Sequence, residues 1–211
     1  MILVPVQNEK NYYILLASDK RLEIYLICPD CNSCIFITWS QYSRHSLPAE
    51  REIIIQRMRC SACKATHALL PAFLFGKIRY TNETIAPYVE QFAEEETTVS
   101  QIYKQSTDPK EISTLHRWFN RLAHQCKQLL PLLQQEIKKN SSKNNFKSLI
   151  KDTSDNHCQI KDVYIMAEQL IQLSKQYDHQ GKLLSPLIFL NYFYWQKTGH
   201  PLLAAIKFSP T

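Results

Sequence analysis

Two pairs of cysteines, each with two residues between its members, stand in the first third of the sequence: CPDC at Cys28–Cys31 and CSAC at Cys60–Cys63. Four thiolates suit Zn²⁺ in a tetrahedral site, and two CxxC turns supply them with little strain. The spacing therefore predicts one Zn²⁺ ion bound by Cys28, Cys31, Cys60 and Cys63. Because protein fills all four positions, no coordination site is open to water, and the ion is expected to be structural.

A third cysteine leaves the first pair open to two interpretations. Cys34 follows Cys31 with the same CxxC spacing, in CPDCNSC. We favour Cys28 as the ligand because Cys-Pro pre-sets a turn there. Asn32, after Cys31, also tolerates the left-handed backbone conformation that such a turn needs. Cys34 is then expected to be a buried thiol at the start of a strand.

His67 lies four residues after Cys63 and carries an imidazole that can bind metal. With four thiolates already bound, we expect it to pack beside the site or to contact a ligand rather than to replace one.

A long helix is predicted after Glu111, with one apolar side and one polar side. Its apolar residues recur at alternating spacings of three and four, which is typical of a core-facing stripe: Ile112, Leu115, Phe119, Leu122, Cys126, Leu129 and Leu133. The other side carries hydroxyl, amide, imidazole and guanidinium groups, from Ser113, Thr114, Arg117, Asn120, Arg121 and His124. Groups of these kinds contact base edges and phosphates in a major groove.

The residues before this helix predict a helix-turn-helix. Thr98-Val-Ser-Gln101 matches a capping box and begins a short helix, and QSTDP reads as a turn. Asp108-Pro-Lys-Glu111 then provides an N-cap, a proline at the first helical position and an early glutamate. A short helix, a turn and a longer helix is the arrangement that places the second helix in the groove of double-stranded DNA.

Positive charge is concentrated in the same region. The chain has a formal net charge of +6, yet ten Lys or Arg and only three Asp or Glu lie between Thr97 and Lys151. Such a basic segment is expected of a protein that binds a polyanion. We expect three of its lysines to contact phosphates: Lys104, Lys127 and Lys138.

CPDC, IIIQRMRCSACKATHALLP and the helix segment STLHRWFNRL together resemble a family of uncharacterised bacterial zinc-ribbon and helix-turn-helix proteins. That family is related to the N-terminal regions of insertion-sequence transposases, and the resemblance covers roughly residues 28–125. It implies zinc at the four cysteines and DNA contact by Ser113, Thr114 and Arg117. Asn32 and Lys64 stand where such turns usually have glycine.

The elements that would position these residues predict an α+β chain: a small N-terminal β zinc ribbon followed by a mainly helical region. Residues 1–78 are expected to form the ribbon, with strands around Cys34–Trp39, Ile53–Met58 and His67–Leu70. Residues 79–140 hold the helix-turn-helix, 141–158 a linker or loop, and 159–211 a C-terminal pair of helices.

The last predicted helix, in 186–197, is apolar nearly all round. At about twelve residues it is too short to cross a bilayer, so it must be buried. The helix is buried either by the rest of the chain or by a partner, such as a second copy in a homodimer. Asn191 within it is expected to make a buried hydrogen bond. With no membrane-spanning segment and no secretory signal, we expect a cytoplasmic protein with reduced cysteines.

Catalysis is not expected. Three glycines in the whole chain leave no room for phosphate-binding loops, and no nucleophile signature appears. A two-metal nuclease needs its carboxylates on a pattern of alternating strands and helices. The carboxylates after the predicted helix-turn-helix do not lie in such a pattern. Two alternatives to DNA binding stay open. One is a protein-interaction adaptor that uses the ribbon and the aromatic C-terminal helix. The other is an RNA-binding protein, with bases stacked on Tyr12, Tyr13, Trp39 and Tyr42.

Overall fold

The structure is a computed structural model that describes residues 1–18, 26–47, 51–76, 78–94, 97–106, 111–140, 156–176 and 183–203. The predicted α+β class is confirmed. The elements of the described residues are β1 (Ile2–Val4), α1 (Glu9–Leu16), β2 (Phe36–Ser46), β3 (Arg51–Cys60), β4 (Thr66–Pro71), α3 (Asn82–Glu94), α4 (Val99–Gln105), α5 (Ile112–Asn140), α6 (Asn156–Ser174) and α7 (Pro186–Thr198).

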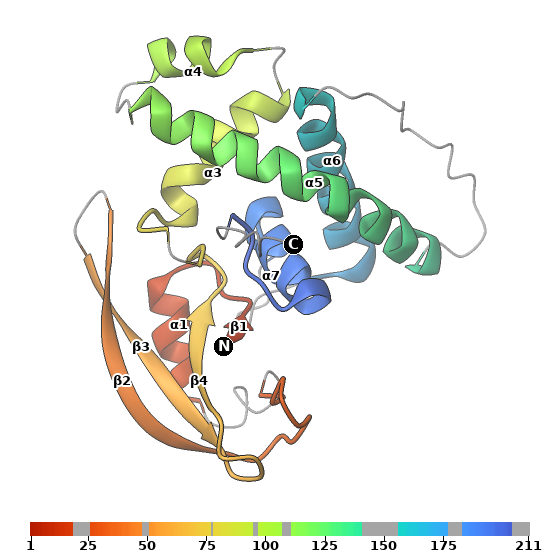
Figure 1. Ribbon diagram of the computed structural model, residues 1–211. Helices are drawn as coiled ribbons and strands as arrows, with labels where there is room; N and C mark the ends of the chain where they lie inside the picture. The colour runs from red at the N-terminus through yellow and green to blue at the C-terminus, as the bar shows by residue number, and fades with distance from the viewer. Residues whose placement is uncertain are drawn as a thin grey trace, which may run out of the picture.

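The four strands form one mixed sheet in the order β1-β4-β3-β2 (Figure 1). The three strands expected from the sequence are β2, β3 and β4, which pair antiparallel. The fourth strand, β1, was not predicted and lies parallel to β4, with Ile2 opposite Leu69. The four helices from α3 to α6 lie above the sheet in the view of Figure 1, while α1 lies beside it.

The side chain of Tyr12, in α1, lies between the backbones of β3 and β4 where their pairing ends. The pairing of β3 with β4 ends at Arg57 opposite Ala68. Gln56 and Leu69, which would form the next pair, are not paired with each other. The Tyr12 hydroxyl accepts a hydrogen bond from the Gln56 N–H at 3.2 Å and donates to the Leu69 carbonyl at 2.8 Å. Tyr12 is fully buried, so base stacking by this residue is excluded.

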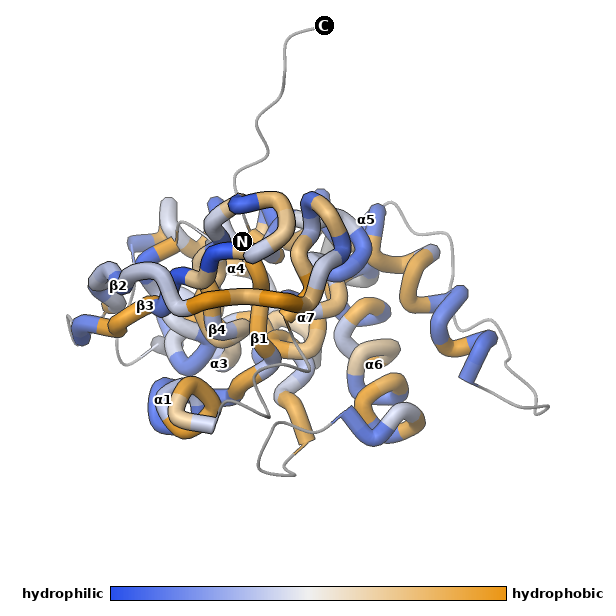
Figure 2. Tube along the Cα trace, turned by 90° about the horizontal axis from the view of Figure 1, so that it is seen from below, coloured by the Kyte–Doolittle hydropathy of each residue, from blue (hydrophilic) through white to orange (hydrophobic). Residues whose placement is uncertain are grey.

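The C-terminal helix α7 is covered by its own chain. Its apolar residues belong to the same core as β1, β4 and the other helices, and Figure 2 shows this hydrophobic tube in the middle of the molecule. The sequence left open whether the chain itself or a partner buries this helix, and the structure shows burial by the chain itself. The predicted buried hydrogen bond is confirmed: the Asn191 amide donates to the carbonyls of Ala72 and Leu74, and its oxygen accepts from the Leu202 N–H.

Helices α4 and α5 follow the sequence pattern closely. The capping box of Thr98 and Gln101 is confirmed at the start of α4. The apolar stripe of α5 is buried except for Ile112, whose predicted burial is wrong: it is 37 % exposed at the first turn.

The predicted Asp108 cap and most of the linker 141–158 lie outside the described residues. The domain boundaries stay predictions.

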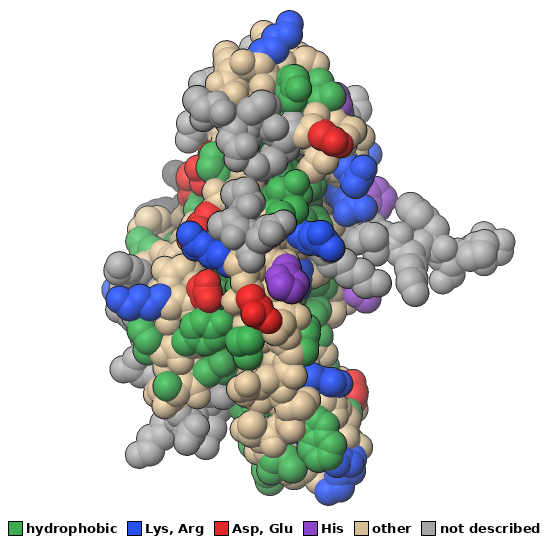
Figure 3. Space-filling model, turned by 90° about the vertical axis from the view of Figure 1, so that its left-hand side faces the viewer, with side chains coloured by type: hydrophobic (Ala, Val, Ile, Leu, Met, Phe, Trp, Pro, Cys, Tyr) green, Lys and Arg blue, Asp and Glu red, His purple; other side chains and the backbone are tan. Residues whose placement is uncertain are grey.

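The side of the sheet formed by the first half of β2 and the end of β3 is exposed. Ile37 and Trp39 are 51 % and 52 % exposed. The Arg59 guanidinium carbon lies 4.5 Å from the centre of the Trp39 ring, so both side chains share this side. In Figure 3, hydrophobic and basic side chains lie next to each other at the lower end of the molecule. We call Ile37, Trp39, Arg57 and Arg59 the exposed sheet face.

Candidate metal centre and nucleic-acid interface

The two CxxC turns have the same backbone geometry. In the first turn the Cys28 N–H donates to Ser33 O and the Asn32 N–H donates to Cys28 O. In the second turn the Cys60 N–H donates to Ala65 O and the Lys64 N–H donates to Cys60 O. Each turn thus repeats the same two bonds, which directs both of its cysteine side chains to one point.

Each turn ends on a residue with a positive φ, 58° for Asn32 and 66° for Lys64. Asn32 therefore has the left-handed conformation predicted for it. Both are positions where the family resemblance leads one to expect glycine, and the backbone conformation explains that preference.

The predicted set of four cysteines is brought together. The sulfur atoms of Cys28, Cys31, Cys60 and Cys63 all lie within 4.8 Å of one another, although the two turns are 28 residues apart in the chain. The Cys28–Cys63 and Cys31–Cys60 sulfur pairs are each 3.6 Å apart. A tetrahedron with Zn–S bonds of about 2.3 Å has edges of about 3.8 Å. The cluster is therefore sized to hold one metal ion.

Cys60 and Cys63 differ in how readily they ionise without a metal ion. The backbone N–H groups of Cys63 and Ala62 lower the pKa of Cys60 to about 6. The Ala65 N–H favours the Cys63 thiolate, but desolvation and the neighbouring thiols outweigh it and raise the pKa of Cys63 to about 12. Four adjacent thiols do not all ionise by themselves, and a dication removes that obstacle.

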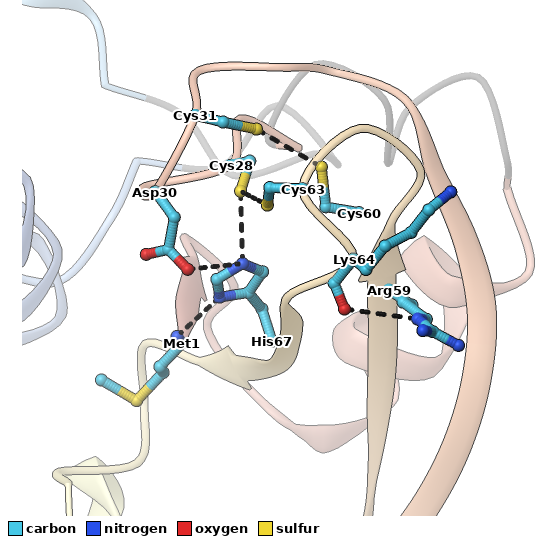
Figure 4. A network of polar contacts seen from close by, with 9 residues as sticks. All are labelled: Met1, Cys28, Asp30, Cys31, Arg59, Cys60, Cys63, Lys64 and His67. Carbon is cyan, nitrogen blue, oxygen red and sulfur yellow. Dashed lines mark hydrogen bonds and ion pairs between the residues drawn. The ribbon is translucent and has the colours of Figure 1, made fainter.

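His67 lies against one of the four sulfurs, as Figure 4 shows. Its Nε2 is 3.3 Å from the Cys28 sulfur and 3.9 Å from an Asp30 carboxylate oxygen, while its Nδ1 is 3.2 Å from the Met1 nitrogen. Burial lowers the pKa of His67, which favours the neutral imidazole. The geometry suits a ring that carries its proton on Nε2 and donates it to Cys28, in agreement with the contact role expected for His67.

Cys34 is outside the cluster. It is exposed rather than buried, so the burial predicted for it is wrong: the strand begins only at Phe36, and Cys34 lies in the loop before it. Asp30 was not singled out from the sequence, because its approach to His67 depends on how the first turn folds onto β4.

Most of the predicted DNA contacts lie on one exposed side of α5. Ser113, Arg117, Asn120, His124, Lys127 and Lys138 are exposed, as is Lys104 at the end of α4. No Asp or Glu occurs from Ile112 to Gln135. The Ser113 hydroxyl donates to the Glu111 carboxylate at 3.3 Å. At about 1.5 Å per residue, Lys138 lies ~37 Å along the helix from Ser113.

The other two predicted contacts, Thr114 and Arg121, are half-buried and turn away from that side. The Arg121 guanidinium donates to the Leu203 carbonyl at 3.4 Å. Both residues line a cleft of about 310 Å³, together with Arg117 and with Arg79, which precedes α3. Arg79 was missed from the sequence, because nothing local marks a loop arginine that meets a helix beginning 33 residues later.

No helix in the described ranges is both long and apolar enough to cross a membrane.

No curated protein and no solved structure matches the chain. Residues 28–118 match a family model described as a domain of unknown function, DUF6431. The matched span runs from the first cysteine of the cluster into the first two turns of α5.

Proposed function

We propose that this protein is a zinc-stabilised, sequence-specific, non-catalytic binder of double-stranded DNA. In this proposal, α4 and α5 form a helix-turn-helix and the cysteine cluster belongs to a zinc ribbon. The resemblance to transposase N-terminal regions suggests a mobile-element setting, in which the protein acts as a site-recognition accessory factor or a repressor.

One observation carries the DNA proposal: the first half of α5 exposes a polar side without a single carboxylate. Arg117, Asn120 and Lys127 share this exposed side, while the opposite side is buried in the core. The short helix α4 packs against both α3 and α5 at this end. A groove-reading helix needs this combination of firm anchoring on one side and free donors on the other.

Zinc is the metal that the donor set favours, because four thiolates in a closed tetrahedron are typical of structural zinc sites. When bound, the ion would join the turn before β2 to the turn between β3 and β4. In Figure 1 these turns lie at the end of the sheet away from α4 and α5, so the ion would stabilise the sheet and not touch DNA beside α5.

The contact between His67 and Cys28 leads to a prediction for metal affinity. We expect His67→Ala to weaken zinc binding by about 10–100-fold, because the Cys28 thiolate loses a hydrogen-bond donor while all four ligands remain. Competition with a chromophoric chelator measures this. His45→Ala, at an exposed position on β2, is the control and should bind zinc like the wild type. Equal affinities for all three proteins would contradict the role assigned to His67.

The function itself is tested by selecting target sites from a random duplex pool and measuring affinity by fluorescence anisotropy. We expect Arg117→Ala to lose about 1–3 kcal/mol at the selected site and little on random duplex. Lys127→Ala should instead weaken both about equally, because a phosphate contact carries no sequence information. Absence of any duplex binding at low salt would refute the proposed function.

A protein-interaction adaptor is the second candidate, favoured by the exposed sheet face. An exposed tryptophan and isoleucine beside two arginines is a composition enriched at protein interfaces (Figure 3). The aromatic helix α7 gives no support to this candidate, because its own chain covers it.

A further inference from the structure

We propose that the cleft between α5 and the segment 78–80 is a phosphate site that takes one phosphodiester of a DNA backbone. This inference rests on the proposed function, and it assigns a shared phosphate to Arg79 and Arg121, while Arg117 at the rim of the cleft keeps its base-reading role. We call this site the arginine cleft.

The charges in the arginine cleft are unbalanced. Three guanidinium groups line a space of about 310 Å³, and no carboxylate side chain is among its lining residues. Within the described part of the chain, none of the three arginines has an Asp or Glu partner within ion-pair distance. Like charges gathered in this way repel one another unless an anion joins them.

The donor types fit a phosphate group. Arginine presents a planar fork of N–H groups that matches phosphate oxygens, and Thr114 adds a hydroxyl at the wall of the cleft. A phosphodiester in a strand has two non-bridging oxygens, and each of them can accept from more than one donor. Arg121 already donates to the Leu203 carbonyl, which fixes its guanidinium at the edge of the site.

The wall that carries Arg79 is held in place by Arg44 of β2 and by Leu47, the residue after that strand. The Arg44 guanidinium donates to the Ile78 carbonyl at 2.7 Å, and the Leu47 N–H donates to the Arg79 carbonyl at 3.0 Å. On the floor, the rings of Tyr80 and Trp118 meet edge to face with centroids 5.0 Å apart. The cleft is therefore preformed, and binding needs little ordering of the backbone.

The cleft also lies beside the proposed reading side of α5. Arg117 belongs to both, since it is exposed on the helix and lines the cleft. Contacts to phosphates next to a recognition helix fix its register on the duplex without reading sequence. We therefore assign Arg121 to a contact with the DNA backbone and not with a base.

The test uses Arg79→Gln, with Arg57→Gln as the control. Both arginines are exposed, and Arg57 lies on the exposed sheet face away from the cleft. We expect Arg79→Gln to weaken selected and random duplexes by the same factor and to reduce the slope of log affinity against log salt by about 0.9. Arg57→Gln should leave both quantities at their wild-type values. Thermal midpoints of the free proteins confirm that the variants are folded.

Three results would overturn the inference. If the wild type binds duplex and Arg79→Gln behaves like Arg57→Gln, the cleft contacts no phosphate, although the proposed function stands. If the wild type binds no duplex, both proposals fail. If adenosine monophosphate or inorganic phosphate raises the thermal midpoint in an Arg79-dependent way while Arg79→Gln leaves duplex binding unchanged, the phosphate belongs to a small molecule.

Discussion

Loss of the metal ion is expected to lower the stability of this protein by about 4 kcal/mol or more, and its thermal midpoint by ~10 °C or more. The four sulfurs join two turns that also meet through the pairing of Phe36 with Cys60 and the bond from the Ser61 N–H to the Ile35 carbonyl. Without the ion, the four sulfurs of the cluster have no cation to coordinate. Cys60→Ser, or treatment with a strong chelator, should produce this effect in thermal unfolding followed by circular dichroism.

Cys34→Ser is the matched control. Cys34 lies in the same CPDCNSC stretch but is exposed and outside the cluster, so its replacement should leave metal content and thermal midpoint unchanged. A loss of metal with Cys34→Ser, together with normal metal content in Cys28→Ser, would show that the first turn uses the other cysteine pair.

The second large effect is expected at Asn191. Replacement by leucine keeps a similar size but leaves the carbonyls of Ala72 and Leu74 and the N–H of Leu202 without the Asn191 side chain. Each buried backbone group that loses its partner costs about 1–3 kcal/mol, so we expect a loss of about 3 kcal/mol or more in the free energy of unfolding. Urea denaturation measures this.

Asn120→Leu provides the comparison for this experiment. Asn120 is exposed on α5, and its replacement should change the free energy of unfolding by no more than about 0.5 kcal/mol. Similar stabilities for Asn191→Leu and Asn120→Leu would contradict the role of Asn191 in tying α7 to the segment after β4.

Local patterns predicted the parts of the fold that depend on local chemistry. The CxxC spacing indicated the four clustered sulfurs, and the apolar spacing of α5 indicated which side of that helix is buried. The burial of Asn191 also followed from its place on an apolar helix.

Parts of the fold that depend on distant contacts were not predictable in this way. Strand β1 has three residues and pairs with β4 more than sixty residues later, and α1 is a helix of eight residues. Neither has enough length for a clear periodic pattern. The arginine cleft combines Arg79 with two arginines of α5, and their convergence follows only from how α5 packs over the segment before α3.

A two-dimensional NMR titration of the zinc-bound protein with a selected duplex tests most directly whether the polar side of α5 contacts duplex DNA. We predict that the largest shifts fall on Ser113, Arg117 and Asn120, with smaller shifts at Arg79 and none at Ile37 and Trp39. Shifts confined to Ile37 and Trp39 on the exposed sheet face, or an unchanged spectrum at saturating duplex, would contradict the account.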